Sequence, residues 1–353
     1  MGPDTFVGKN IAFFNSDLES GYNQRWNLNV QRLLPQRILL EVGYVGSRVV
    51  RLPISKNLNA LPDQYLSTLP VRDQDTINRL TTQVDNPFYP LLPGTNLASQ
   101  TVAVQQLLLP YPQFGTVTAL ENQGYSWYHA LQVRGERRFS EGFSLLGSYT
   151  FSKLMEATTY LNDGDQVPSR TISPNDRRHH LSLSGIYELP FGSGRRLVSK
   201  PVAGLRQLIS GWQTEWTWQM YSGEPLTFGN YFFNGNPDDI RLSGDQRNVD
   251  EWFNTNAGFV RASADQPLFN LRTAPLYYSG VRAPIYNNWD AGLIKDTVLY
   301  ESLKLQFRAE AFNVFNHPSF AAPNTTVTSQ AFGTITSENS NPRQLQLALR
   351  LIW

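Results

Sequence analysis

The chain has 353 residues, a formal net charge of +1 and no cysteine. A chain this close to neutral lacks the basic field by which many proteins bind nucleic acid, and without cysteine it forms neither disulfides nor thiolate metal sites. No apolar run approaches the roughly 18 residues that a membrane-spanning helix needs; alternating strands would escape this test.

The strongest pattern along the chain is a period of two, which predicts β-strands. In the first example, residues 25–32, Trp26, Leu28 and Val30 alternate with asparagine and glutamine. The last example, residues 345–353, alternates a row of leucines with mostly polar residues and ends on an aromatic side chain. In chain order we expect nine strands, at residues 25–32, 38–46, 128–139, 143–153, 180–192, 211–220, 287–296, 302–312 and 345–353.

The expected connections alternate between short and long. Turns of a few residues join the first strand to the second, the third to the fourth and the seventh to the eighth, and an intermediate segment at about 190–210 joins the fifth to the sixth. Compact soluble domains rarely carry several long irregular loops, whereas outer-membrane barrels combine short periplasmic turns with long extracellular loops. Residues 1–20 are expected to be a loop or remnant, and the long loops lie at about 49–125, 156–178, 225–285 and 317–342.

The fold class expected from these patterns is therefore all-β, an antiparallel up-and-down portion of a transmembrane β-barrel. A soluble or secreted β-sandwich also alternates, but its outer face should be rich in exposed Lys, Glu and Thr. Here the polar face is mainly Gln, Asn, Ser and Gly with mixed charges, which favours a barrel lumen. Aromatic residues near the strand ends suit the girdles of a membrane barrel; they are Trp127, Tyr128, Tyr149, Tyr187, Trp212 and Trp289.

Several longer stretches together resemble one known family. They are NPFYPLLPG, LLLPYPQFGTV, YHALQVRGERRFSEGFSLLGSYTFSK, YELPFG, GWQTEWTWQMYSGEPLT and LKLQFRAEAFNVFNHPSF, in this order. From about residue 20 to the end, the chain resembles the C-terminal part of the β-barrel of Oar-like TonB-dependent outer-membrane receptors, which are abundant in acidobacteria.

The resemblance implies a larger whole. Such receptors carry a signal peptide, a carboxypeptidase-regulatory-like domain, a plug and a barrel expected to have 22 strands. The sequence shows nine strands at residues 21–353 and nothing like a plug or a signal peptide, so we expect a partial barrel whose true start lies upstream. The implied partners are the outer-membrane bilayer, the barrel-assembly machinery, TonB, a plug domain and an unidentified solute, and the implied location is the cell outer membrane.

Charged residues on the polar faces of the late strands are the candidate site. Lys304, Arg308 and Glu310 share one face with Gln306. Alternation also places Glu215 and Asp290 on polar faces of their strands, and we expect Asp290 to lie within reach of Arg308 or Glu310 in a cross-strand charge ladder. The candidate lumen-facing residues are Glu215, Asp290, Lys304, Arg308 and Glu310.

Three further motifs give weaker indications of function. Asp176 with His179 and His180 suggests a metal site, but adjacent residues of a strand face opposite ways, so a charged loop edge is the better interpretation. Asn236 with Asp238 and Asp239 matches no complete calcium loop, and loop packing explains it better. The sequon at Asn324 is best read as chance. Nothing resembles a catalytic constellation, so we expect no enzyme activity, cofactor or metal.

The carboxyl terminus offers an assembly signal. By the same resemblance, Leu349, Leu351 and Trp353 match the terminal signal by which the barrel-assembly machinery recognises its substrates. Two other functions stay open at this level: a secreted or surface β-sandwich that binds glycans or proteins, and a small passive outer-membrane barrel.

Overall fold

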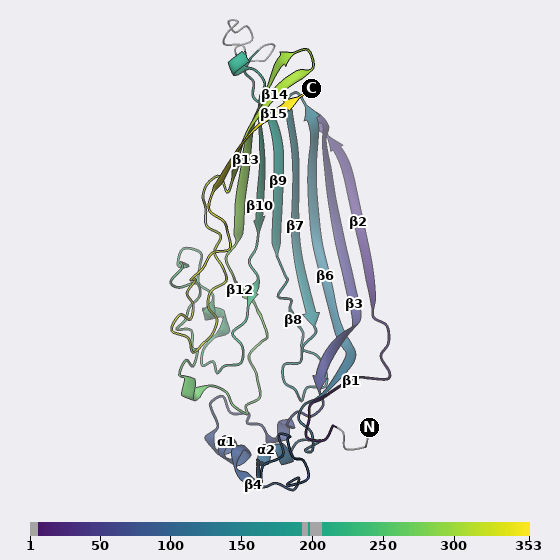
Figure 1. The fold of residues 1–353 in the computed structure, drawn as a ribbon, viewed down its shortest axis with the longest axis vertical. Coiled ribbons are helices and arrows are strands. Elements are labelled where there is room, and N and C mark those ends of the chain that lie inside the picture. The colour runs from purple at the N-terminus through teal and green to yellow at the C-terminus, as the bar shows by residue number, and fades with distance from the viewer. Residues whose placement is uncertain (1–5, 193–196, 198–206) are drawn as a thin grey trace.

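All nine predicted strands are present and form one antiparallel sheet. The computed structural model describes residues 6–192, 197 and 207–353. The strands follow one another as a meander in the order β15-β14-β13-β10-β9-β7-β6-β3-β2 (Figure 1). Their bounds are β2 Tyr22–Leu34, β3 Ile38–Asn57, β6 Val117–Ser140, β7 Phe143–Ala157, β9 His179–Glu188, β10 Trp212–Tyr221, β13 Tyr286–Tyr300, β14 Leu303–Phe312 and β15 Gln344–Ile352.

Some boundaries differ from those expected. β3 continues to Asn57 and β6 begins at Val117, so the first long connection is 58–116 rather than 49–125. Two bulges interrupt the register of this extension, which is why periodicity alone does not reveal it. Within residues 1–20, β1 (Ile11–Phe14) pairs in parallel with β6, and β8 (Thr171–Ile172) adds to β7. The connection predicted at 317–342 spans 313–343.

The register gives each side of the sheet a distinct character. Residues directly opposite in an antiparallel pair share a face. Leu305 faces Leu351 and Phe307 faces Leu349, so the leucines of β15 continue an apolar face across the sheet. This apolar face is exposed, with Leu345 at 74% and Leu347 at 72%. The same register puts five of the six predicted girdle aromatics on the apolar face, whereas the prediction for Tyr128 is wrong, because its partners Ser47 and Leu154 lie on the polar face.

The two ends of the sheet are built differently. At the end that holds the carboxyl terminus (Figure 1), β2 joins β3 through the short 3-10 helix Pro35–Arg37, and β13 joins β14 at Glu301. The turn between β6 and β7 places Glu141 and Gly142 at positive φ, and glycine adopts that conformation without steric cost. The connection predicted at about 190–210 lies partly outside the described residues.

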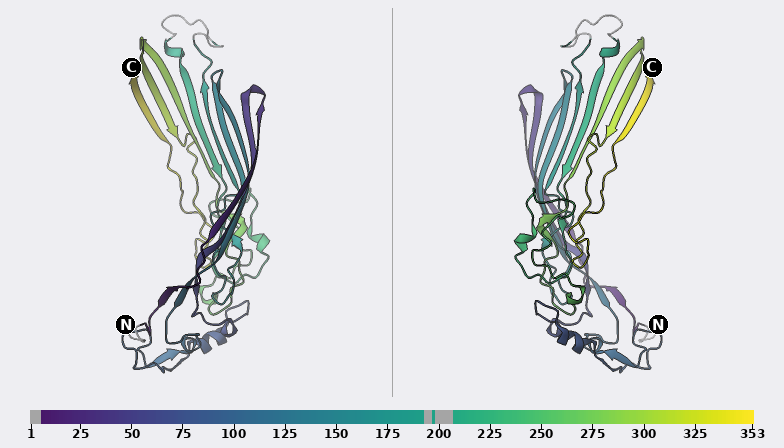
Figure 2. Two further views of the ribbon diagram at one scale, coloured as in Figure 1. Left: turned by 90° about the vertical axis from the view of Figure 1, so that its right-hand side faces the viewer. Right: turned by 90° about the vertical axis from the view of Figure 1, so that its left-hand side faces the viewer.

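At the other end, the four long connections pack together into what we call the loop assembly: residues 58–116, 158–178, 222–285 and 313–343 (Figures 1 and 2). Its core is aromatic. Phe228 contacts Phe253 with ring centroids 4.9 Å apart, and Phe332, from the last loop, lies 5.1 Å from Phe253. Phe253 and Ile240 are fully buried. The connections 222–285 and 313–343 therefore hold their shape by a hydrophobic core of their own.

Polar contacts tie the other loops to that core. The Asn162 amide donates to the backbone oxygen of Arg272, whose N–H donates to Asn162 Oδ1. Asn270 donates to two carbonyls of residues 69–71. The remaining elements of the assembly are short: α1 Gln74–Thr81, α2 Val104–Leu107, β4 Gln83–Asp85, β5 Thr101–Ala103, β11 Pro225–Leu226, β12 Tyr278–Arg282 and the 3-10 helices Asp63–Tyr65, Pro237–Ile240 and Ser263–Asp265. None of the helices within the described residues is long and apolar enough to cross a membrane.

Candidate functional site: a charged cavity on the polar face

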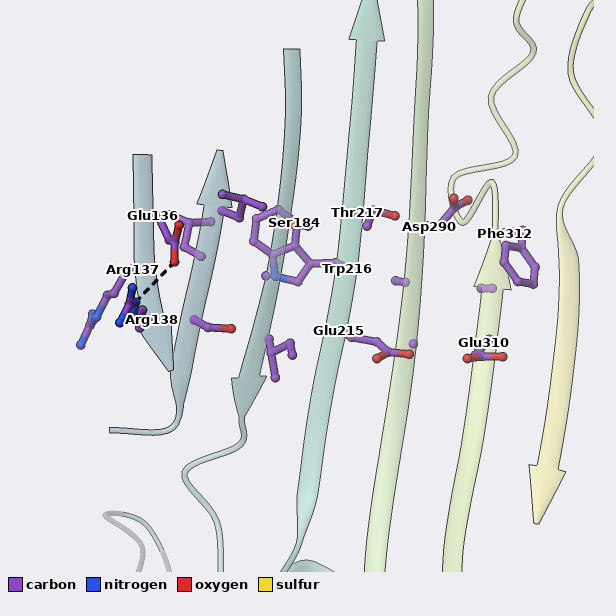
Figure 3. A pocket seen from close by; sticks show the side chains of 18 of the residues that line it. Glu136, Arg137, Arg138, Ser184, Glu215, Trp216, Thr217, Asp290, Glu310 and Phe312 are labelled. Atoms are coloured by element: carbon purple, nitrogen blue, oxygen red, sulfur yellow. Dashed lines mark ion pairs between the residues drawn. The ribbon is translucent and has the colours of Figure 1, made fainter. Parts of the chain in front are cut away.

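A cavity of about 560 Å³ lies across the polar face of the sheet. Six neighbouring strands, from β6 to β14, contribute to its lining (Figure 3). The side chains that reach it come mainly from alternate positions of these strands, as the pleat requires. Three of the five predicted lumen-facing residues line it, namely Glu215, Asp290 and Glu310.

Arg308 joins two of these carboxylates. Its Nη2 donates to Glu215 Oε1 at 2.8 Å and to Glu310 Oε1 at 2.9 Å. Glu215 lies on β10, two strands away from Arg308, and Gly292 of the intervening β13 is its register partner. A Cβ at Gly292 would come within 2.9 Å of the Glu215 side chain. The missing side chain lets Glu215 lie over β13, as Figure 3 shows, and from there it accepts from the guanidinium of Arg308.

The pairing predicted for Asp290 is wrong. Asp290 Oδ1 accepts from the backbone N–H of Asn313 at 2.9 Å and from the side-chain amide of Asn288 at 3.0 Å. It therefore fixes the start of the connection from β14 to β15 instead of joining the ladder. The reason is register: Asp290 lies opposite Thr217, one step beyond the last pair that β13 forms with β14.

The prediction missed the opposite side of the cavity. On β6, Arg134 Nη2 lies 3.0 Å from Glu136 Oε2, and Arg138 Nε lies 3.6 Å from Glu136 Oε1. Alternation already places Arg134 and Glu136 on one face, so the signal was present in the sequence. Only the curvature of the sheet shows that they and Glu215 line the same cavity.

The two sides of the cavity differ in charge. On β10 to β14 the lining holds the three carboxylates of Glu215, Asp290 and Glu310, two of which pair with Arg308 beside the cavity. On β6, Arg134 and Arg138 both pair with Glu136, so guanidinium groups outnumber carboxylates there. Mixed charges that pair across a wall limit the cost of desolvation and still leave acceptors and donors free for a passing molecule. Lys304 shares the polar face but lies outside this lining, near the carboxyl-terminal edge opposite Ile352.

The DRRHH segment holds the loops in place. Asp176 is 1% exposed; its Oδ2 lies 2.6 Å from Arg282 Nη2, and its Oδ1 accepts from the Leu154 N–H at 2.6 Å. Burial lowers the pKa of Arg282, and the contact with Asp176 opposes that shift. His179 contacts Tyr149, and His180 packs on Tyr221 on the other face. Asp176 therefore belongs to a charged loop edge, as expected, and its partner is Arg282, whose side chain is 13% exposed.

The structure around Asn236, Asp238 and Asp239 also agrees with loop packing, the interpretation preferred over a calcium site. The Asn236 side chain accepts from the Asp238 N–H and caps the 3-10 helix Pro237–Ile240. Tyr231 and Phe232, just before this segment, are buried. Throughout the described ranges, no group of three His, Cys, Asp or Glu residues could hold a metal ion.

The predicted assembly residues lie on the apolar face at the carboxyl terminus. Leu349 is 71% exposed and Leu351 53% exposed, and both belong to the outward leucine row of β15. Trp353 follows the strand and is 89% exposed. A row of exposed leucines that ends in an exposed tryptophan suits a lipid environment rather than water.

One curved meander with an exposed apolar face, a charged polar face and loops gathered at one end defines the wall of an outer-membrane β-barrel. The sheet is not closed, and it ends at β2 and β15. The profile of the outer membrane beta barrel domain matches residues 2–346, and the chain belongs to this family.

The comparisons with curated sequences and solved structures give less information about the chain. No curated protein sequence matches the chain. Among solved structures, the outer membrane transporter YddB from Escherichia coli is similar at 10% sequence identity with a TM-score of 0.44. The match covers 98% of this chain and 35% of that one, so the chain spans about a third of the length of YddB.

Proposed function

We propose that this chain forms part of the barrel wall of an Oar-like TonB-dependent receptor that takes up a solute across the outer membrane. The observation that carries the proposal is the polar face, where Glu215, Arg308 and Glu310 form a paired charge row beside a cavity that spans six strands. A wall of this kind suits a lumen filled with water, solute and other protein groups. The six stretches that resemble Oar-like receptors support the finer assignment.

In this proposal the short turns face the periplasm and the loop assembly faces the exterior. The loop assembly supplies the first contacts with the solute, because specificity usually resides in loops held by a rigid scaffold. The polar face supplies the path, along which Glu215, Asp290, Lys304, Arg308 and Glu310 contact the solute or a plug domain. TonB acts on that plug from the periplasm, and the chain performs no catalysis and uses no cofactor.

Energy-dependent uptake tests the proposal. The coding sequence would first be extended upstream in frame, and the complete reading frame expressed in strains with and without TonB. Cells would receive a mixture of iron chelates, vitamins, oligosaccharides and peptides, and depletion of each from the medium would be measured. We expect one solute to be depleted only in the strain with TonB. Equal depletion in both strains would instead identify a passive barrel.

A β-sandwich requires two sheets packed face to face, whereas the nine long strands form one continuous sheet. Membrane fractionation gives an independent check. Recovery of the protein from the soluble fraction without detergent would contradict the barrel.

Recognition by the assembly machinery is a separate part of the proposal. We expect replacement of Trp353 by Asp to reduce the amount of receptor at the cell surface several-fold, because a charge replaces the terminal aromatic. The matched control is Gln344→Asp, which places the same charge on the polar face of the same strand, opposite Phe312 and away from Glu310. Surface labelling and heat-dependent gel mobility are the measurements, and normal surface levels of the Trp353 variant would contradict the assignment.

A further inference from the structure

The apolar face carries charges of only one sign. Across the uninterrupted register of the nine long strands, this face holds no Asp or Glu among the described residues. Its basic residues lie at the two rims and leave the middle to leucine, valine, alanine, glycine and aromatic side chains. Arg32, Arg137 and Lys295 lie toward the short turns, and Arg48 and Lys153 lie toward the loop assembly.

The two rims differ in how these bases are engaged. At the short-turn rim, two of the three bases are engaged: Arg137 pairs with Glu141 at 3.4 Å, and Lys295 Nζ donates to the Ser210 carbonyl at 2.7 Å, whereas Arg32 is exposed. At the loop-assembly rim, Arg48 and Lys153 are exposed, and neither makes an ion pair with a carboxylate in the part of the chain that the structure describes. This rim therefore presents positive charge without an internal partner.

A third base and a cavity complete the arrangement. Arg170, from the loop after β7, lies over the Tyr125 ring at 5.8 Å and donates through Nε to the Tyr125 hydroxyl at 2.9 Å. Lys153 and Arg170 line the same cavity of about 360 Å³, together with Met155, Ile172 and the hydroxyl-bearing Thr171. The cavity thus combines two cations with an apolar floor.

Aromatic residues surround these bases. Trp127 is the register partner of both Arg48 and Met155, and it stacks on Tyr125 at 5.8 Å. His129, opposite Lys153, bonds through Nδ1 to the Tyr44 hydroxyl at 2.6 Å. Tryptophan and tyrosine gather where hydrocarbon meets headgroups, and long basic side chains extend from that depth toward lipid phosphates.

We propose that Lys153 and Arg170, assisted by Arg48, form a binding site for the phosphorylated headgroup of an outer-membrane lipid. The cations meet the phosphate, and the apolar floor with Met155 and Ile172, which share the apolar face, meets the lipid body. Lys153 and Met155 lie on the apolar face, opposite the face that holds the charged cavity, so the site does not depend on the proposed transport function.

Selective lipid retention tests the site. The protein extracted from outer membranes in detergent would be mixed with equal amounts of dilauroyl phosphatidic acid and dilauroyl phosphatidylcholine, and bound lipid would be counted by native mass spectrometry. We expect the wild type to retain phosphatidic acid preferentially. Lys153→Gln and Arg170→Gln should each reduce that preference roughly fivefold, and the double variant about 25-fold. Arg32→Gln, an exposed base at the other rim of the same face, should leave it unchanged.

Two results would overturn the proposal. The first is equal retention of both lipids by the wild type, or undiminished preference in the single variants with wild-type heat-dependent gel mobility. The second comes from an arm with excess inorganic phosphate. We expect the lipid to stay bound, because the apolar floor and the aromatic residues also contribute. Displacement of the lipid by inorganic phosphate alone would identify a site for free anions rather than for a lipid.

Discussion

The sheet and the loop assembly place their hydrophobic residues in opposite ways. In the loop assembly, Phe253 and Ile240 are fully buried, as in a water-soluble domain. In β15, Leu345 and Leu347 are more than 70% exposed, and their polar neighbours line the other face. Each pattern buries apolar surface away from water only if the two regions meet different solvents, water around the loops and lipid around the sheet. The difference therefore locates the membrane along the chain.

The largest effect is expected in the loop assembly, the region that packs like a water-soluble domain. Phe253→Ala removes the ring that contacts both Phe228 and Phe332, and we expect it to destabilise the loop assembly by about 3–5 kcal/mol. Limited proteolysis and hydrogen exchange of residues 222–285 measure the effect. Leu91→Ala, at a side chain 74% exposed, is the control. If the loops are instead held mainly by the sheet, both variants will resist protease equally.

The second-largest effect is expected on the apolar, lipid-facing side of the sheet. Leu347→Arg would be harmless on a water-exposed strand, but in a bilayer we expect a loss of about 2–4 kcal/mol. The free energy of unfolding by urea in lipid vesicles is the measurement. Gln346→Arg introduces the same residue on the polar face opposite Glu310 and should cost little. Equal stability of the two variants would place the leucine row in water.

A smaller effect is expected on the polar face, where it tests whether the charge row stabilises the sheet. Arg308→Ala leaves Glu215 and Glu310 without their shared cation, and we expect a loss of about 1–2 kcal/mol, reduced because a third of the Arg308 side chain is exposed. Lys304→Ala, on the same strand and face, should change stability less. The measurement is again unfolding in vesicles, and unchanged stability of the Arg308 variant would remove the charge row as a structural element.

The smallest effect concerns pH. Burial, with a contribution from the hydrogen bond to the Tyr278 hydroxyl, raises the pKa of Tyr231 above its ordinary 10.0. A raised pKa means that stability is complete below pH of about 10 and is lost above it, because the unfolded tyrosine ionises first. We expect hydrogen exchange in the loop assembly to accelerate above that pH. The double change Tyr231→Phe and Tyr278→Phe should delay this loss, whereas Tyr111→Phe, at an exposed position, should not.

The local pattern of the sequence was enough to predict the nine strands, their order as a meander and the faces of most of their side chains. A period of two depends only on the pleat, and short turns force the strands that they join to pair. The pairing across the four long connections was expected from the up-and-down order of a membrane barrel. For the same reason the exposed leucine row of β15 and the polar position of Arg308 were predictable. The extension of β3 to Asn57 was not, because bulges break the period there.

Tertiary structure decided which polar residues meet. Glu215 reaches Arg308 because Gly292 leaves room between them, and Asp290 holds the Asn313 backbone because of its place in the register. Asp176 pairs with Arg282, 106 residues away, through loops whose paths no periodic pattern encodes. The sequence by itself thus determined the strands and the solvent that each face suits. Contacts across strands and between loops depend on register, curvature and packing, which exist only once the whole sheet has formed.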